Sequence, residues 1–151
     1  MEMELKSTVI SEAEQFNEFR DLLRSVGLPC DDLTLDKHIL IGYYENEKLI
    51  GTGALELYGK YALLRSLAVK DAQRGRMLGS KITDELIAQA RENQISHIYL
   101  LTETARLFFK RKGFVDFLRE NVPAAVQASS EFSGVCSNEA VCMELTLTSE
   151  G

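Results

Sequence analysis

The sequence predicts an α/β fold with a mixed central β-sheet and helices on both of its faces, built as a single domain over residues 1–151. Segments with helical spacing of apolar residues alternate with short runs rich in β-branched and aromatic residues. A helical segment separates two such runs, 61–69 and 97–102, and this connection makes the two strands parallel. No tract rich in Pro, Gly or Ser interrupts the chain, so nothing indicates a linker between domains.

The first half of the chain predicts a strand, a helix and three further strands. We expect the helix over residues 12–26, because its apolar residues share one side and Gly27 and Pro29 end it. The three strands that follow are separated by tight turns and span residues 38–44, 49–57 and 61–69. The last of them is almost entirely apolar, so we expect it in the middle of the sheet.

The second half predicts a long helix over residues 76–93. Its buried stripe repeats every four residues, at Leu78, Ile82, Leu86 and Ala90. The remaining predicted elements are a strand at 97–102, helices at 104–113 and 123–134, and a strand at 140–147. The expected order is β-α-β-β-β-α-β-α-β-α-β, which includes one further strand between the helices at 104–113 and 123–134.

The charge balance argues against nucleic acid as a partner, and the length of the apolar runs argues against a membrane-spanning segment. Lysine and arginine total 17 against 23 aspartates and glutamates, which gives a formal net charge of −6 without any basic tract. No apolar run reaches the length of about 18 residues that spans a bilayer. The N-terminus carries acids where a secretory signal has basic residues, so we expect a soluble, cytoplasmic protein.

The cysteines and histidines do not have the spacing of metal ligands, so we expect no bound metal. They are Cys30, Cys136, Cys142, His38 and His97. We interpret the cysteines as small buried hydrophobic residues, with a reactive thiol as the alternative.

A turn rich in glycine and arginine lies between the strand at 61–69 and the next helix. The first N–H groups of that helix form an anion site. Gly75 and Gly79 lack a Cβ and allow a phosphate to approach the backbone, while Arg74 and Arg76 add charge. The spacings of the dinucleotide fingerprint and of the P-loop are absent. From these residues alone, the turn is either a phosphate cradle or an ordinary polar turn.

The run RSLAVKDAQRGRMLGSKI resembles the signature of the GNAT superfamily of acyl-CoA-dependent N-acyltransferases, in which R/Q-x-x-G-x-G/A binds the pyrophosphate of coenzyme A. Arg74 and Gly79 match this motif, whereas Met77 replaces the usual glycine. We expect Met77 in helical conformation, which requires no positive φ, and we expect its side chain to crowd the phosphates. The resemblance implies acetyl-CoA as acyl donor and a set of cofactor-binding residues, Leu67, Ala68, Val69, Arg74, Gly75, Arg76, Met77, Leu78, Gly79, Ser80 and Phe109.

A narrower resemblance points to the acceptor. The pattern LLT-x-TA-x-x-FF-x-x-x-GF is similar to the acetyltransferase domain of N-acetylglutamate synthases. Most of the chain from Leu28 onward resembles arsenic-resistance, arsinothricin-type amino-acid N-acetyltransferases. These resemblances imply a small primary amine as acceptor, either an amino acid or an amino-acid-like toxin.

Phe109 departs from the pattern that the resemblance implies, because many superfamily members have there a tyrosine that protonates the departing thiolate. A phenyl ring cannot donate a proton, so the thiolate needs another source. The open alternatives are water, Ser66, Thr102, Tyr58 and Tyr61.

Two acids are candidate bases for the acceptor ammonium. Glu56 lies near the end of an apolar strand, where burial would raise its pKa, and Glu103 is the second candidate. Arg65 interrupts the most apolar strand and should meet either an acid such as Glu56 or a substrate carboxylate. By the resemblance, the Val69 N–H would polarise the thioester carbonyl.

We therefore expect an N-acetyltransferase, a monomer or homodimer, with an acceptor site that includes Arg65, Ser66, Tyr58 and Thr102. Two alternatives stay open at this point. One is a non-catalytic module that binds or senses acyl-CoA, and the other is a peptide or protein N-acetyltransferase.

Overall fold

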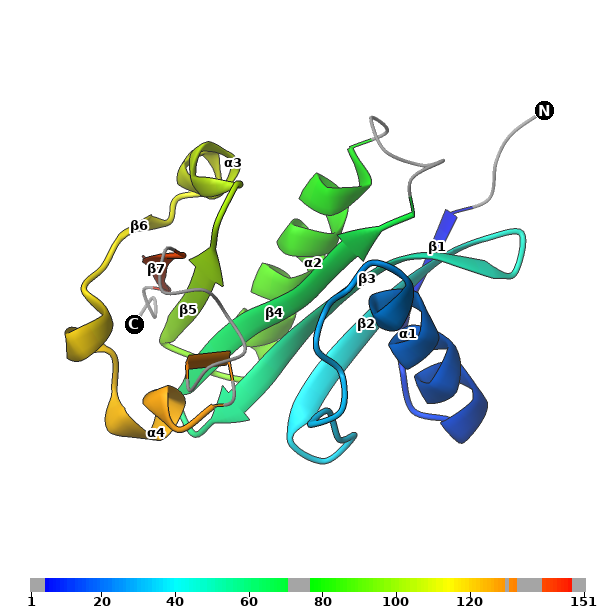
Figure 1. Ribbon diagram of the computed structural model, residues 1–151, viewed down its shortest axis with the longest axis horizontal. Coiled ribbons are helices and arrows are strands. Elements are labelled where there is room, and N and C mark those ends of the chain that lie inside the picture. The colour runs from blue at the N-terminus through cyan, green and yellow to red at the C-terminus, as the bar shows by residue number, and fades with distance from the viewer. Residues whose placement is uncertain (1–4, 71–76, 130, 133–139, 148–151) are drawn as a thin grey trace. The chain divides into compact units, whose positions relative to one another are not determined.

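The computed structural model describes residues 5–70, 77–129, 131–132 and 140–147. Among these residues, seven strands form one sheet in the order β1-β2-β3-β4-β5-β7-β6. The sheet is mixed, because β4 and β5 pair in parallel whereas the other described pairings are antiparallel. The chain forms two compact units (Figure 1). The first unit comprises Met1–Glu56 and Arg65–Gln89, and the second comprises Leu57–Leu64 and Ala90–Gly151.

The first unit contains the antiparallel strands that carry most of the candidate site. These are β1 (Leu5–Val9), β2 (His38–Glu45), and the larger parts of β3 (Lys48–Tyr58) and β4 (Tyr61–Val69). Asn46 and Glu47 have φ of 51° and 70°, which closes the β2–β3 hairpin with a tight turn. The hairpin register places His38 directly opposite Glu56.

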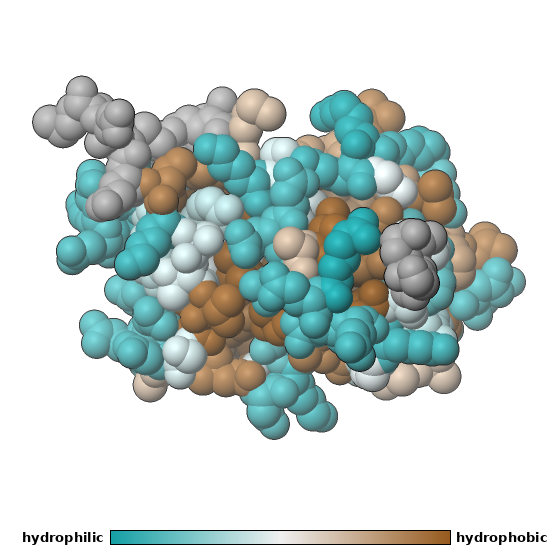
Figure 2. Space-filling view, turned by 180° about the vertical axis from the view of Figure 1, so that it is seen from behind, coloured by the Kyte–Doolittle hydropathy of each residue, from teal (hydrophilic) through white to brown (hydrophobic). Residues whose placement is uncertain are grey.

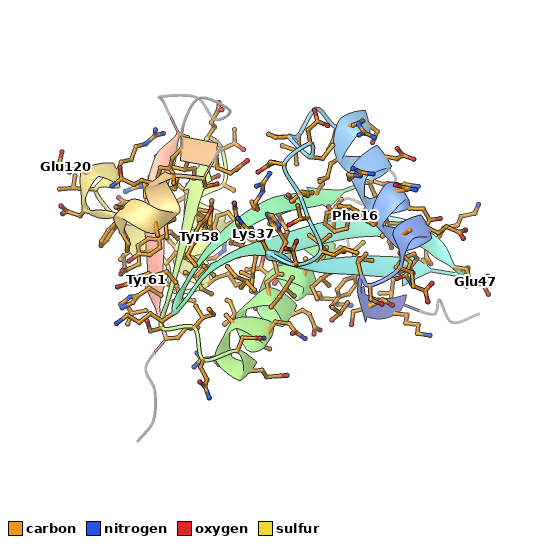
Figure 3. The ribbon with its side chains drawn as sticks, turned by 90° about the horizontal axis from the view of Figure 1, so that it is seen from below. Phe16, Lys37, Glu47, Tyr58, Tyr61 and Glu120 are labelled. Atoms are coloured by element: carbon orange, nitrogen blue, oxygen red, sulfur yellow. The ribbon has the colours of Figure 1, made fainter. Side chains whose placement is uncertain are left out.

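Helices α1 (Ala13–Ser25) and α2 (Leu78–Glu92) lie on opposite sides of the strands of the first unit (Figure 3). The apolar face of α1 packs into one buried cluster, which includes Phe19, Leu22, Leu23, Leu40 and Ala54. On the other side, α2 lies close against glycines of β3. A Cβ on Gly53 would lie 2.5 Å from Ile82 Cγ2, so this close approach requires glycine.

The second unit contains the end of the β3–β4 hairpin and the C-terminal elements. These are β5 (His97–Thr102), α3 (Arg106–Arg111), β6 (Val115–Asp116), the 3₁₀ turn η2 (Arg119–Asn121), α4 (Ala124–Gln127) and β7 (Val141–Thr146). Tyr61 of β4 pairs with His97 of β5 in parallel, which confirms the expected βαβ connection. The core of this unit includes Leu63, Tyr99, Val122, Val126 and Cys142.

The predicted element order is confirmed, but two helices differ from the prediction. The helix expected over 123–134 ends at Gln127. Ser129 Oγ accepts a hydrogen bond from the Glu131 N–H at 3.2 Å, and such local side-chain bonds compete with helix continuation. The long helix begins at Leu78. Met77 was expected to be helical, and this was wrong, because its φ is +61°.

Polar and apolar side chains are interspersed on the face shown in Figure 2. None of the described helices combines the length and the apolar character needed to span a membrane.

Candidate active site

The N-terminus of α2 is the part of the predicted phosphate cradle that the structure describes, whereas Arg74, Gly75 and Arg76 lie outside the described residues. Met77 O accepts a hydrogen bond from the Lys81 N–H at 3.1 Å, and Met77 is 71% exposed. A Cβ on Gly79 would meet no atom of the described residues within 4 Å. With respect to the described residues, the backbone at Gly79 is open to approach, as a phosphate site requires.

Strand β4 has an unusual conformation at Ser66, just before Leu67, Ala68 and Val69. The φ of Ser66 is +61°, a left-handed conformation that costs a residue other than glycine about 1–2 kcal/mol. Thr52 Oγ1 donates a hydrogen bond to Ser66 O at 2.8 Å and holds this geometry from β3. Within the described part of the chain, the buried Ser66 Oγ has no hydrogen-bond partner. Strained backbone and an unsatisfied buried hydroxyl together are typical of functional positions.

Arg65 lies at the centre of a buried ionic network in the first unit. Its Nη1 and Nη2 donate to Asp32 Oδ2 and Oδ1 at 2.6 Å and 2.8 Å, which is a bidentate pair. Nη1 also lies 3.1 Å from Glu56 Oε1. The expectation that Arg65 meets an acid such as Glu56 is confirmed.

The same contacts disfavour the alternative interpretation of Arg65 as a clamp for a substrate carboxylate. Its side chain is 0% exposed, and Asp32 occupies the bidentate position that such a carboxylate would need. Sequence reasoning missed Asp32, which belongs to the acidic connection after α1. The available signal was the arginine itself, since a buried guanidinium has five donors and needs more than one acceptor.

His38 is a second member of the site that sequence reasoning missed, because it was considered only as a metal ligand. It is the first residue of β2, and its side chain is 2% exposed. Nδ1 lies 3.0 Å from Thr34 O and 3.2 Å from Thr34 N, while Nε2 lies 3.9 Å from Glu56 Oε2. Burial lowers the pKa of His38, and this exceeds the opposing effect of the Glu56 carboxylate.

Asp32, His38 and Glu56 place three possible metal-ligand atoms within 4.8 Å of one another. The guanidinium of Arg65 contacts both acids, so a metal ion there would face a full positive charge at close range. The donor set therefore suits an ionic and proton-transfer network better than a cation site.

The other candidate residues belong to the second unit. Glu103 is exposed in the segment after β5, and Thr102 Oγ1 accepts a hydrogen bond from the Ala105 N–H at 3.0 Å, which supports the start of α3. Tyr58 and Tyr61 stand on either side of the β3–β4 turn and pack against the core of this unit (Figure 3). These contacts are structural, and they leave any role of these residues in the reaction as a prediction.

Phe109 is buried in α3, where its ring meets Phe108 and Phe114 edge to face. Two of the three cysteines, Cys30 and Cys142, are free and buried, as the hydrophobic interpretation expects. Burial raises the pKa of both thiols, that of Cys142 to about 11, which disfavours the reactive thiolate. Cys136 lies outside the described residues.

Comparison with known proteins identifies the family. Residues 36–116, more than half of the chain, match the family described as acetyltransferase (GNAT) domain. The chain belongs to the GNAT acetyltransferase family. Ser66 and the start of α2 both lie within the matched residues of this GNAT chain.

Three relatives show how far the likeness of this GNAT chain extends. An amino-acid acetyltransferase of Mycobacterium tuberculosis is 33% identical over 85 residues, which are 56% of this chain and 47% of that protein. The chain thus spans about half the length of the curated relative that it matches. A GNAT acetyltransferase from Staphylococcus aureus Mu50 has a TM-score of 0.76 and 18% identity, with 96% of this chain and 100% of that chain covered.

The third relative is an N-acetylglutamate synthase from Neisseria gonorrhoeae, crystallised with coenzyme A and N-acetyl-glutamate. Its TM-score is 0.76 at 18% identity, and the match covers 99% of this chain and 36% of that chain. At such identities the solved structures establish the fold and leave the acceptor open. Enzymes that acetylate ribosomal protein S18 or aminoglycosides share this fold as well.

Proposed function

We propose that this GNAT domain transfers the acetyl group of acetyl-CoA to a small primary amine of the amino-acid type. The observation that carries the proposal is the buried carboxylate of Glu56, held by Arg65 on the strand that neighbours β4 in the sheet. The names of two relatives, an amino-acid acetyltransferase and an N-acetylglutamate synthase, support an amino-acid acceptor. We further propose that residues 1–151 act as one domain in the cytoplasm, without a metal, as a monomer or homodimer.

The proposed cofactor-binding roles rest on the family resemblance, and the proposed roles of Glu56 and Arg65 rest on their contacts. The residues that would hold acetyl-CoA are Leu67, Ala68, Val69, Leu78, Gly79 and Ser80, together with the turn before α2. Acetyl-CoA would supply an acetyl thioester, whose carbonyl the Val69 N–H would polarise. Because N-acetyl transfer requires a neutral amine, a base must first remove one proton from the acceptor ammonium.

Glu56 is the proposed base, with Arg65 as a positioning residue. The Glu56 side chain is 11% exposed, so a substrate group can reach it while most bulk water is excluded. Asp32 orients Arg65 by its bidentate contact, and Arg65 in turn fixes Glu56 Oε1. The amine would attack the thioester carbon after its proton moves to Glu56, and the C–S bond would then break to release the CoA thiolate.

A test of the acyl-CoA assignment uses Gly79→Asp, with Gly79→Ala as its matched control. The space beside Gly79 accepts a side chain, and an acid in the first turn of a helix does not oppose the helix dipole. We expect Gly79→Asp to fold as well as Gly79→Ala and to lose at least about tenfold in acetyl-CoA affinity by calorimetry, through repulsion of the pyrophosphate. Equal affinities in the two variants would contradict the assignment.

A test of the base compares Glu56→Gln with Glu103→Gln, the change at the exposed second candidate. The assay is thiol release from acetyl-CoA with a panel of amino acids, short peptides and aminoglycosides. We expect Glu56→Gln to lower kcat by about 10²–10⁴ with acetyl-CoA affinity unchanged, and Glu103→Gln to retain activity. Tight acetyl-CoA binding without thiol release by the unmodified protein for any amine would favour the sensing module. Turnover with peptides alone would favour the peptide acetyltransferase.

A further inference from the structure

His38 and Glu56 form a pair across two neighbouring strands. Lys37, labelled in Figure 3, immediately precedes His38 at the start of β2. The β2–β3 register sets His38 opposite Glu56 and brings Nε2 to 3.9 Å from Glu56 Oε2. Glu56 therefore faces two different groups, because its Oε1 accepts from Arg65 and its Oε2 points toward the imidazole.

The imidazole has its Nδ1 engaged, whereas Nε2 is buried and has no hydrogen-bond partner among the described residues. If Nε2 carried the hydrogen, a buried donor would stand 3.9 Å from a carboxylate without bonding to it, and orphaned buried donors are rare. Two contacts with Thr34 bear on Nδ1: Thr34 O, at 3.0 Å, would accept from Nδ1–H, whereas the Thr34 N–H, at 3.2 Å, would donate to an unprotonated Nδ1. With the hydrogen on Nδ1 the shorter of these two contacts is a hydrogen bond, and the Nε2 lone pair faces the Glu56 carboxylate at 3.9 Å. We assign the Nδ1–H tautomer from the shorter of the two Thr34 contacts and from the rarity of an orphaned buried N–H at Nε2.

We propose that His38 is a positioning residue behind Glu56 that receives the acceptor's proton from it, an inference that rests on the proposed function. The ammonium N–H bond breaks and its proton joins Glu56. The protonated Oε2–H then donates to the Nε2 lone pair, and transfer of the proton leaves an imidazolium beside a regenerated carboxylate. The proton returns through Glu56 to solvent after the products leave.

The charged groups around His38 suit this role. Glu56 from β3 and Asp32 from the preceding loop favour the imidazolium, whereas Arg65 from β4 opposes it. Burial lowers the pKa of His38, so the imidazole is neutral at neutral pH, and the imidazolium formed by proton uptake readily returns its proton. Its side chain, 2% exposed, is too enclosed to touch the amine directly, so it acts through Glu56.

The first test reads the tautomer without any activity. The chain has two histidines, so long-range ¹⁵N–¹H spectra contain two imidazole patterns, and His97→Gln assigns them. We expect the Nδ1–H tautomer for His38 at neutral pH. An Nε2–H tautomer would overturn the proposal, because that nitrogen could not accept a proton. This result would leave the assignment of Glu56 untouched.

The second test uses His38→Gln, whose amide can bond to Glu56 but cannot take up a proton at neutral pH, with His97→Gln as control. In a variant with unchanged unfolding midpoint and acetyl-CoA affinity, we expect kcat to fall at least about tenfold. The pH–rate profile should also lose its lower inflection. Retained kcat and profile in His38→Gln, with activity lost in Glu56→Gln, would overturn the relay alone. Full activity in Glu56→Gln would instead refute the proposed function.

Discussion

Removal of the Arg65 guanidinium should strongly destabilise the first unit. Arg65 is 3% exposed and pairs with both Asp32 and Glu56. Deleting one partner of a buried ion pair costs about 3–5 kcal/mol, because a buried charge is left uncompensated. The Asp32 side chain is 32% exposed and can regain water, so most of the loss falls on Glu56. We therefore expect Arg65→Met to lower the free energy of unfolding by about 3 kcal/mol, at the low end of that range.

The assay is a double-mutant cycle measured by urea unfolding. Glu56→Gln alone should cost less, about 1–2 kcal/mol, because Arg65 keeps its bidentate pair with Asp32. Arg65→Met combined with Glu56→Gln removes both interacting charges, so its cost should be smaller than the sum of the single costs by about 1–2 kcal/mol. Arg106→Met is the matched control, because Arg106 makes a similar pair with Asp116 but has a side chain 45% exposed.

Two outcomes would refute this reasoning. A loss in Arg65→Met no larger than that in Arg106→Met would mean that the buried network contributes no more than a surface pair. Additive losses in the double variant would mean that Arg65 and Glu56 are energetically independent, and Arg65 could then not be the residue that positions Glu56.

Four further measurements follow from the structure. Gly53→Ala should cost about 1–3 kcal/mol in urea unfolding, because the added Cβ would lie 2.5 Å from Ile82 Cγ2. Met77→Gly should raise the free energy of unfolding by up to about 1 kcal/mol, since glycine accepts the φ of +61° without strain. Alkylation of Cys142 in the native protein at pH 8 should be at least about a hundredfold slower than that of an ordinary thiol, because its pKa is raised from 9.0 to about 11. Burial lowers the pKa of His38 below its ordinary value of 6.5. As the pH falls, the imidazole of His38 is therefore protonated in the unfolded chain before it is protonated in the folded protein. The contribution of neutral His38 to the free energy of unfolding is thus retained above pH 6.5 and lost as the pH falls toward the pKa of His38 in the folded protein. In urea unfolding at several pH values, His38→Gln should reduce this acid-dependent loss of stability.

The fold was predictable because its elements repeat simple patterns. Periodicity located both long helices, and the βαβ rule predicted the parallel pairing of β4 with β5. The helix expected over 123–134 was less predictable. Its length depends on whether serines bond to the local backbone, as Ser129 does, and apolar spacing carries no information about such bonds.

The candidate site was predictable only where a residue is anomalous in its own segment. Arg65 stands out in an apolar strand, and its need for an acid led to Glu56. Asp32 and His38 look ordinary in sequence, because an acid in a polar loop and a histidine at a strand end are common. Their importance comes from the β2–β3 register and from the path of the loop after α1, which only the folded chain brings together.

Two residues in the region that resembles the GNAT motif have a left-handed backbone conformation. Ser66 and Met77 both have φ of +61°, and such conformations persist only where the surrounding structure requires them. The Thr52 hydroxyl holds Ser66, and a hydrogen bond from Lys81 holds Met77 at the start of α2. Met77 therefore holds at an energetic cost a φ that glycine, the usual residue of the family pattern, adopts without strain. Stability and acetyl-CoA affinity should for this reason respond separately, with Met77→Gly acting mainly on the first and Gly79→Asp on the second.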